Sequence, residues 1–158
     1  MRLSTKGRYA VAAMLDLAIH YEEGPVTLAD ISASQSISLP YLEQLFARLR
    51  KNGLVVGLRG PGGGYRLSRP PEEISIATVI NAIGEGIDAT SCEGNENCQD
   101  GERCLTHELW NKLGNEIFGF LDGITLAGFL QRDRVSALVR RQQAVAITAA
   151  SDLRKTVA

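Results

Sequence analysis

The sequence predicts a mainly α-helical protein with a small β-hairpin, built as a winged helix-turn-helix with a long dimerisation helix. Three observations predict this fold class. Two short amphipathic segments with helical spacing lie close together in residues 26–51. Two alternating runs around a glycine-rich stretch follow them directly, and a ladder of apolar residues at three- and four-residue steps begins near residue 105.

The first helix is predicted to begin near Ser4 or Thr5, either of which can cap it, and to end at Gly24-Pro25. Its apolar residues recur at the spacing of a buried helix face: Leu3, Tyr9, Val11, Met14, Leu15, Ala18 and Ile19. Its basic residues stand together at one end: Arg2, Lys6 and Arg8.

A second helix is predicted within residues 26–37, where Thr27 can cap the start and Asp30 occupies the capping-box position. After a turn, a third is predicted from Leu39 to Lys51, because Pro40 fits the first turn of a helix. Its buried stripe is Leu42, Leu45, Phe46 and Leu49, and its remaining surface is polar and basic. Two short helices joined by a tight turn indicate a helix-turn-helix, a pattern that other small helical pairs share.

Residues 54–69 alternate through two strand-like runs and are predicted to form a β-hairpin with the tip Gly60-Pro61-Gly62-Gly63-Gly64. Arg59 and Arg66 flank this tip, and a hairpin directly after a helix-turn-helix is the wing of a winged helix. The tip lacks the Lys-Ser/Thr of a phosphate loop and opens no helix, which argues against nucleotide binding. A merely tolerant turn is the alternative, but we favour a DNA-binding wing because glycine lets the backbone approach a phosphate closely.

Pro70-Pro71 interrupts regular secondary structure. The sequence of residues 72–85 predicts one short helix with an apolar face. The long helix that follows has a continuous apolar stripe, composed of Leu105, Leu109, Trp110, Leu113, Ile117, Phe120 and Leu121. This stripe can pack on its own domain or on the same helix of a second subunit. We expect a homodimer, since helix-turn-helix proteins commonly bind DNA as two-fold dimers. A further short helix is expected at 124–130.

All three cysteines lie in the stretch CEGNENCQDGERCLTH, at Cys92, Cys98 and Cys104, with His107 three positions after the last. Gly, Asn and Asp residues between them favour a loop. Four such ligands suit a zinc ion or an iron–sulfur cluster, and their spacing does not decide between the two. We expect Cys104 and His107, three apart at a predicted helix start, to face the same point. Three unrelated cysteines are the alternative, but free cysteines usually sit singly on apolar faces.

Charge is distributed unevenly along the 158 residues, although the net charge is only −1. Residues 1–69 contain nine Lys and Arg against five Asp and Glu, and residues 70–158 contain eight against thirteen. A basic front half suits a polyanion, although ordinary solvated surface gives similar excesses. The odd cysteine number and the lack of a signal-like or long apolar run favour a cytoplasmic protein without membrane association. No nucleophile–base pair is recognisable, so no enzymatic activity is expected.

The predicted organisation has four parts. A winged helix-turn-helix DNA-binding domain occupies residues 1–84, and a metal- or cluster-binding loop occupies residues 85–107. A dimerisation-helix region follows at 105–130. Residues 131–158 are predicted to be a flexible or weakly helical tail, to which we assign no function.

Four motifs, MRLSTKGRYAVAAMLDLA, ISLPYLEQLFARLRKNGLV, RGPGGGYRL and C-x5-C-x5-C-x2-H, resemble the IscR family of iron–sulfur cluster regulators over roughly residues 1–130. The resemblance implies a homodimeric winged-helix transcription factor with a 2Fe-2S cluster on Cys92, Cys98, Cys104 and His107. In that family, cluster occupancy reports iron–sulfur supply and represses the cluster-assembly operon when high. The apo and holo forms bind different classes of DNA site. Cluster donor proteins are expected as further partners.

The resemblance also places Glu43 at the position that discriminates between the two classes of site. The expected DNA contacts are Arg2, Lys6, Tyr41, Glu43, Gln44, Arg59, Gly60, Pro61, Gly62 and Gly63. Pro40 departs from the serine found in many family members and removes a hydroxyl and an N–H there. Three other interpretations remain: a nitric-oxide- or redox-sensing regulator of the same fold, a zinc-stabilised DNA-binding protein, and an electron-transfer protein using the same cluster.

Overall fold

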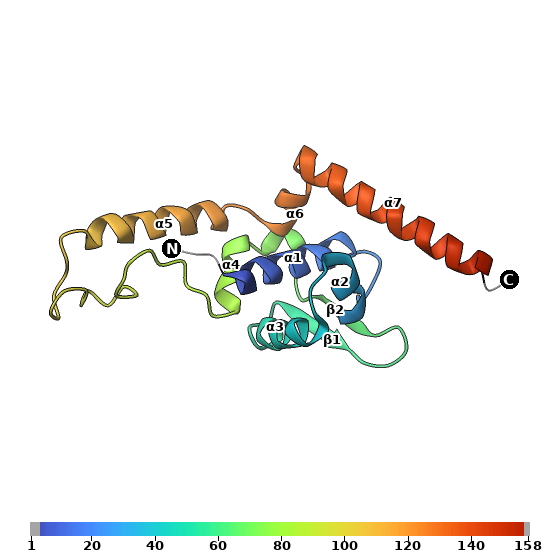
Figure 1. Ribbon diagram of the computed structural model, residues 1–158, viewed down its shortest axis with the longest axis horizontal. Coiled ribbons are helices and arrows are strands. Elements are labelled where there is room, and N and C mark those ends of the chain that lie inside the picture. The colour runs from blue at the N-terminus through green and yellow to red at the C-terminus, as the bar shows by residue number, and fades with distance from the viewer. Residues whose placement is uncertain (1–3, 157–158) are drawn as a thin grey trace.

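The computed structural model describes residues 4–156, and the side chains of residues 4–145. A helical body lies at the centre, with the cysteine loop and α5 extending from one end and α7 from the other (Figure 1). The helices are α1 (Thr5–Ile19), α2 (Leu28–Gln35), α3 (Leu39–Lys51), α4 (Ile76–Ala82), α5 (His107–Asp122), α6 (Leu126–Leu130) and α7 (Asp133–Thr156). Two strands, β1 (Val55–Leu58) and β2 (Gly64–Leu67), and a 3-10 turn, η1 (Pro71–Glu73), complete the described chain.

The helix-turn-helix is formed by α2 and α3 and is fixed by local capping. Thr27 caps α2, because its hydroxyl oxygen accepts the Asp30 backbone N–H at 3.1 Å. In place of the reciprocal bond of a capping box, the Thr27 hydroxyl donates to the Asp30 carboxylate at 2.6 Å. Ser36 ends α2 in the left-handed conformation, with φ of 54°, and α3 begins after Ser38 with a proline in its first turn.

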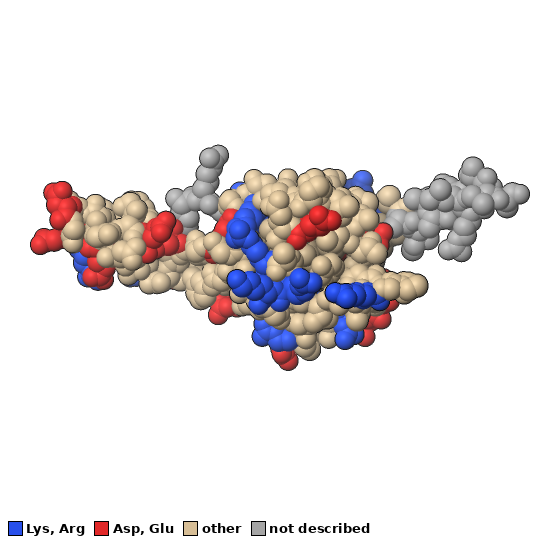
Figure 2. Space-filling view, turned by 90° about the horizontal axis from the view of Figure 1, so that it is seen from below, with Lys and Arg blue, Asp and Glu red and all other residues tan. Residues whose placement is uncertain are grey.

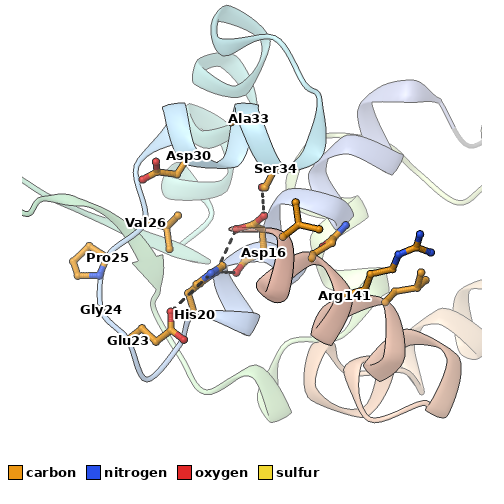
Figure 3. A pocket seen from close by; sticks show the side chains of 13 residues that line it. Asp16, His20, Glu23, Gly24, Pro25, Val26, Asp30, Ala33, Ser34 and Arg141 are labelled. Atoms are coloured by element: carbon orange, nitrogen blue, oxygen red, sulfur yellow. Dashed lines mark hydrogen bonds and ion pairs between the residues drawn. The ribbon is translucent and has the colours of Figure 1, made fainter. Parts of the chain in front are cut away.

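A buried carboxylate joins α1 to the end of α2. Asp16 is 3% exposed and accepts hydrogen bonds from the Ser34 hydroxyl and from Gln35 Nε2, the latter at 2.8 Å. Its other oxygen lies 3.4 Å from His20 Nδ1 (Figure 3). A cleft of about 920 Å³ opens beside this group, between α1, α2 and α7, and Arg141 lines its far wall. The carboxylate thus fixes the angle at which the helix-turn-helix leaves α1.

The hairpin has the predicted form and is extended by a third segment. β1 and β2 pair antiparallel, with Val55 opposite Leu67 and Leu58 opposite Gly64. Tyr65 exchanges two 2.8 Å backbone hydrogen bonds with Val26, which ties the wing to the chain before α2. Gly64 is required there, since its φ is +150° and a Cβ would lie 2.5 Å from the Val26 oxygen.

One hydrophobic core unites α1, α2, α3, α4, α6 and the hairpin. Phe46 of α3 is fully buried and packs edge-on against Tyr65, with ring centroids 4.8 Å apart. All four residues predicted as the buried stripe of α3 lie in this core: Leu42, Leu45, Phe46 and Leu49. The apolar face of the third predicted helix is therefore confirmed.

α4 is the element that connects the body to α5. At its N-terminal end, Ile76 N donates to Ile124 O at 2.9 Å, and the Ser75 hydroxyl donates to Asp122 at 2.7 Å. Leu126 N returns a bond to Ile74 O at 2.9 Å. These bonds anchor the end of α5 and the start of α6 to α4.

The long helix and the further short helix predicted after residue 107 are both present, because α5 ends at Asp122, the chain turns at Gly123 and α6 follows. The segment 131–158, predicted to be a flexible or weakly helical tail, contains the 24-residue helix α7. Its sequence from 133 to 156 has no glycine or proline and is rich in alanine and arginine, which are strong helix formers. No helix within residues 4–156 combines the length and hydropathy needed to cross a bilayer.

Candidate metal centre and nucleic-acid interface

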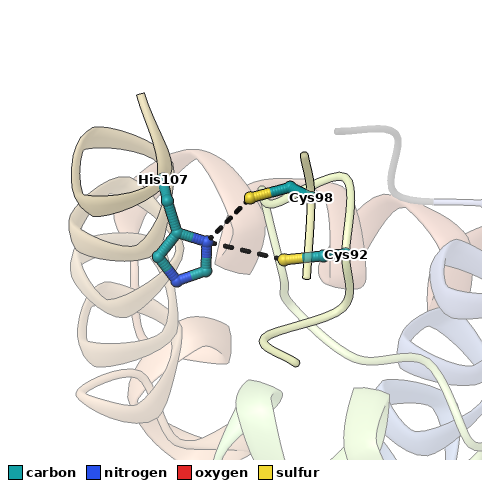
Figure 4. A group of neighbouring side chains, drawn as sticks. All are labelled: Cys92, Cys98 and His107. Atoms are coloured by element: carbon teal, nitrogen blue, oxygen red, sulfur yellow. Dashed lines mark hydrogen bonds between the residues drawn. The ribbon is translucent and has the colours of Figure 1, made fainter. Parts of the chain in front are cut away.

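Three of the four predicted ligands converge at the start of α5. The sulfurs of Cys92 and Cys98 each lie 3.5 Å from Nδ1 of His107 (Figure 4). The three donor atoms all lie within 4.8 Å of one another. His107 is 3% exposed and Cys92 is 9% exposed, so the centre is shielded from water.

Cys104 lies beside this group but outside the helix. Because α5 begins at His107, Cys104 stands in the preceding turn, and the expectation that both residues share the start of one helix is wrong. The carbonyl of Cys104 accepts the His107 N–H at 3.1 Å, and its own N–H donates to the Cys98 sulfur at 3.1 Å. Its thiol lies 3.7 Å from the Thr106 hydroxyl. The turn therefore holds Cys104 next to Cys98 without placing its sulfur among the three convergent atoms.

The loop backbone is held in a conformation that its residues would not adopt alone. Glu93, Glu96 and Asp100 have φ of 52°, 59° and 49°, in the left-handed region that costs a non-glycine residue about 1 kcal/mol or more. An ion pair between Glu96 and Arg103 closes the loop across its base. A bound metal that fixes several ligands at once would compensate for this cost.

The thiols differ in acidity because their neighbours differ. Burial raises the pKa of Cys92, but hydrogen bonds from Thr90, the Glu96 backbone, Cys98 and His107 outweigh burial and lower it to about 7. The pKa of Cys104 is lowered, chiefly by the Cys98 thiol. The Cys104 N–H donates to the Cys98 sulfur and lowers the pKa of Cys98. The hydrogen bond with the Cys104 thiol, burial and the neighbouring Cys92 outweigh this effect, so the pKa of Cys98 is raised.

The Cys92 pKa predicts the pH dependence of the metal-free protein. Thiolate absorbance of the wild type minus that of Cys92→Ser is expected to rise with a midpoint of about pH 7, well below an ordinary cysteine. Because a depressed pKa favours the charged form, the thiolate is present above pH 7 and is lost as pH falls through that value. Metal affinity should weaken over the same acid range, since the proton competes for the ligand. A difference titration centred near pH 9 would contradict this.

The donor set fits a thiophilic metal group. Three thiolates and an imidazole form a complete four-ligand set for zinc or for an iron–sulfur cluster. Zinc bound to sulfur at about 2.3 Å and to nitrogen at about 2.0–2.1 Å in a tetrahedron places these atoms roughly 3.6 Å apart. The 3.5 Å separations at His107 match that value, so the three convergent atoms can bind a single metal atom.

Basic side chains gather on the face that carries α3 and the wing. Figure 2 views this face, where blue side chains gather over the body while red side chains mark the cysteine-loop end. Glu43, Gln44 and Arg59 are exposed, and Tyr41 is half-buried with its ring edge-on to Tyr9 at 5.5 Å. The wing tip, Gly60 to Gly63, projects with them.

Two predicted DNA contacts, Lys6 and Arg2, are not part of this exposed group. The ammonium of Lys6 donates a hydrogen bond to the carbonyl of Ile83 at the end of α4. The sequence did not indicate this contact. Arg2 lies outside the described residues. Arg48 belongs to the polar and basic surface predicted for the third helix, and Asn52 directly follows the predicted end of that helix, yet both side chains contact the end of α4. No spacing pattern signals these contacts, because the partners are backbone carbonyls 30 and 35 residues away.

Fold and site together define a class: a winged helix-turn-helix DNA-binding protein with a candidate metal site lined by cysteine and histidine. A family model described as Rrf2, iron-dependent transcriptional regulator, matches residues 3–132. The chain belongs to the Rrf2 family of transcriptional regulators.

Relatives within this family resemble the chain over most of its length. The HTH-type transcriptional regulator IscR of Serratia proteamaculans is 59% identical over 90% of this chain and 87% of its own. A putative HTH-type transcriptional regulator ORF2 of Azotobacter vinelandii shows the same identity and coverage. Among solved structures, T. potens IscR is 43% identical with a TM-score of 0.70, covering 83% of this chain and 87% of the other. CymR, the global cysteine regulator of B. subtilis, is 33% identical with a TM-score of 0.71, covering 82% and 95%.

These likenesses confirm the predicted IscR resemblance and the winged helix-turn-helix fold class. The protein is a transcriptional regulator rather than an enzyme, and it binds DNA. The site of Cys92, Cys98 and His107 is consistent with iron–sulfur ligation.

Proposed function

We propose that this regulator senses iron–sulfur status through a 2Fe-2S cluster held by Cys92, Cys98, Cys104 and His107, and controls genes of cluster biosynthesis. The observation that carries the proposal is the convergence of two thiols on one imidazole in an IscR-like chain. The adjacent Cys104 completes a donor set of the right number and chemistry. Such a cluster can be assembled and lost reversibly, so its occupancy would report the supply of iron and sulfide.

The chain's own residues give the site its sensitivity. His107 contributes a neutral, protonatable ligand, which binds iron less firmly than a thiolate. Around the ligands, the left-handed loop residues are held only by the Glu96–Arg103 pair and by short-range hydrogen bonds such as the reciprocal pair between Gln99 and Glu102. Loss of the cluster should therefore free the loop to relax, while the body keeps its core.

We propose that α3 enters the major groove and that the wing contacts the adjacent backbone. Tyr41, Glu43 and Gln44 occupy the first half of α3, where a recognition helix meets base edges. A carboxylate accepts from cytosine N4 and is repelled by base-edge acceptors, so Glu43 can discriminate between classes of site. Arg59 and the backbone of Gly60, Pro61, Gly62 and Gly63 would hold phosphates or a minor groove.

The N-terminal cations are proposed to add phosphate contacts. An ammonium has three donors, so the bond from Lys6 to Ile83 leaves two for a phosphate. Arg2 is proposed as a second phosphate or minor-groove contact on the strength of the family resemblance alone. We also propose that cluster donor proteins supply the site and that the protein works in the cytoplasm, where its DNA lies.

Anaerobic reconstitution followed by iron, sulfide and zinc analysis tests the cofactor. We expect about two irons and two sulfides per chain, and affinities for two classes of DNA site that change with cluster occupancy. A colourless protein with one zinc per chain and unchanged DNA binding would instead establish a zinc-stabilised regulator, which the 3.5 Å ligand spacing favours as the second candidate. In the same assay, Glu43→Ala should alter the ratio of apo-protein affinities for the two classes.

Neutralising the wing should weaken binding to every DNA sequence. Arg59→Ala is expected to lower affinity and to reduce the slope of log affinity against log salt by about one unit, because one phosphate contact is lost. Fluorescence anisotropy at several salt concentrations measures both quantities. Arg141→Ala removes an equal charge from α7 and serves as the control. An unchanged salt slope in Arg59→Ala would exclude a phosphate contact at that residue.

We propose a homodimer built on α5. Apolar side chains on this helix are left open to solvent in the single chain, with Leu109 60%, Trp110 41% and Phe120 65% exposed. Exposed apolar area on this scale usually marks a protein interface, and α5 also packs partly on α4 of its own domain. Two copies would place two recognition helices on successive half-sites.

Charge on the α5 stripe should break this dimer. Leu109→Asp is expected to weaken self-association at least about tenfold, because a carboxylate would be buried without a partner. Sedimentation velocity across a concentration series measures the change. Glu116→Asp, a conservative change on the same helix, is the control. A wild-type chain that sediments as a monomer at all concentrations would refute the dimer.

A further inference from the structure

The C-terminal end of α4 is the point where the cysteine loop leaves the folded body, and side chains of the DNA-binding half hold it. Asn52 Nδ2 donates to the Ala82 carbonyl at 2.8 Å. Arg48 Nη1 donates to the Ile83 carbonyl, also at 2.8 Å, and Lys6 donates to the same oxygen. The last carbonyls of a helix have no partner within it and carry its negative end, so these donors satisfy them well.

Two of these donors belong to the end of the recognition helix itself. Arg48 lies in the last turn of α3, and Asn52 is its C-terminal capping residue. Asn52 also donates to the Arg48 carbonyl at 2.9 Å, which joins the two side chains into one unit. A short helix moves as a rigid body, so a displacement of the α4 end would be transmitted to the exposed residues of α3.

The same α4 end continues directly into the ligand loop. Gly84 turns the chain with φ of +77°, and a Cβ there would lie 3.3 Å from Arg48 Nη1. Cys92 follows eight residues later. Between them, the backbone of residues 87–89 packs against α5 at Gly114, where a Cβ would lie 3.2 Å from the Ile87 oxygen. The path from the ligands to α3 is therefore short and held at several points.

We propose that Arg48 and Asn52 are positioning residues that couple the state of the cysteine loop to the recognition helix through the Ala82 and Ile83 carbonyls. This inference rests on the proposed sensing function and names the residues that would carry it. When the loop changes shape, the α4 end shifts, and the two donors move α3 with it. Neither side chain needs to contact the metal group or a DNA base.

The test compares cluster-loaded and cluster-free protein on both classes of DNA site. For at least one class of site, the DNA affinities of cluster-loaded and cluster-free wild type should differ by a ratio of at least about five, as is usual for allosteric coupling. In Arg48→Ala/Asn52→Ala this ratio should fall to within about twofold of one, with wild-type cluster content. Arg50→Ala removes the same charge from the same turn and should keep the wild-type ratio. Asn52→Ala alone leaves the charge intact and should reduce the ratio partially.

A second readout needs no cluster and no DNA. Amides of residues 84–91 should exchange hydrogen faster in the double variant of cluster-free protein than in wild type or Arg50→Ala, because the α4 end is no longer held. A folded double variant with a wild-type affinity ratio overturns the coupling, and so does unchanged exchange at 84–91. If wild type itself shows no difference between its two states at either class of site, the proposed sensing function fails and the coupling fails with it.

Discussion

Cys98→Ala is expected to reduce cluster retention at least about tenfold, because it removes a donor that lies within reach of both His107 and Cys104. The loss should appear as missing visible absorbance and missing iron after anaerobic reconstitution. Folding of the body should be unaffected, since the core is built from α1–α4, α6 and the hairpin and contains none of the cysteines.

Asn97→Ala is the matched control for this variant. Asn97 is the neighbouring loop residue, is exposed and offers no thiolate. It should load as wild type does. Full cluster content in Cys98→Ala, or equal losses in both variants, would refute the assignment of Cys98 as a ligand.

Phe46→Ala should destabilise the protein by about 3–5 kcal/mol, the usual cost of emptying a buried phenylalanine site. Phe46 is fully buried in α3 and packs against Tyr65, so its loss removes the contact that seats the recognition helix on the wing. Urea unfolding of cluster-free protein at one fixed concentration measures the change. DNA affinity should fall as well.

Two comparisons make this test sharp. Phe46→Leu keeps most of the volume and should cost clearly less than the alanine variant. Leu105→Ala truncates a residue that is 100% exposed and should change the stability by less than about 0.5 kcal/mol in the monomer. A Phe46→Ala midpoint equal to that of Leu105→Ala would mean that the core does not depend on this ring.

Cys98→Ala and Phe46→Ala test the two halves of the molecule separately. One acts on a loop whose backbone includes left-handed residues and which carries the candidate ligands. The other acts on a body with a continuous core. On the proposed function, such a regulator would lose its cluster without unfolding, so both states would be available to bind DNA. α4, hydrogen-bonded to α5 at one end and to α3 at the other, joins the two halves.

Much of the fold could be predicted because its signals are local. Thr27 as a cap, the four-residue stripe of α3 and the glycine tip of the hairpin each act on their own few residues. The grouping of Cys92, Cys98 and His107 as a candidate metal site could also be predicted, since thiols and an imidazole at short spacing have few other uses. Where α7 forms, the sequence predicts only a flexible or weakly helical tail, because alanine and arginine favour a helix without any strong capping pattern to define it.

The sequence by itself determined the winged helix-turn-helix, the candidate ligands Cys92, Cys98 and His107, and the apolar stripe of α5 apart from Leu105, which precedes the helix. Periodicity, turn residues and ligand chemistry are properties of neighbouring residues. Only the tertiary structure decided that Cys104 stands beside the convergent group rather than on α5, and that Arg48 and Asn52 hold the end of α4. These contacts join a side chain to a backbone carbonyl of a distant segment. Every residue carries such a carbonyl, so no pattern of residue types can specify which one is bound.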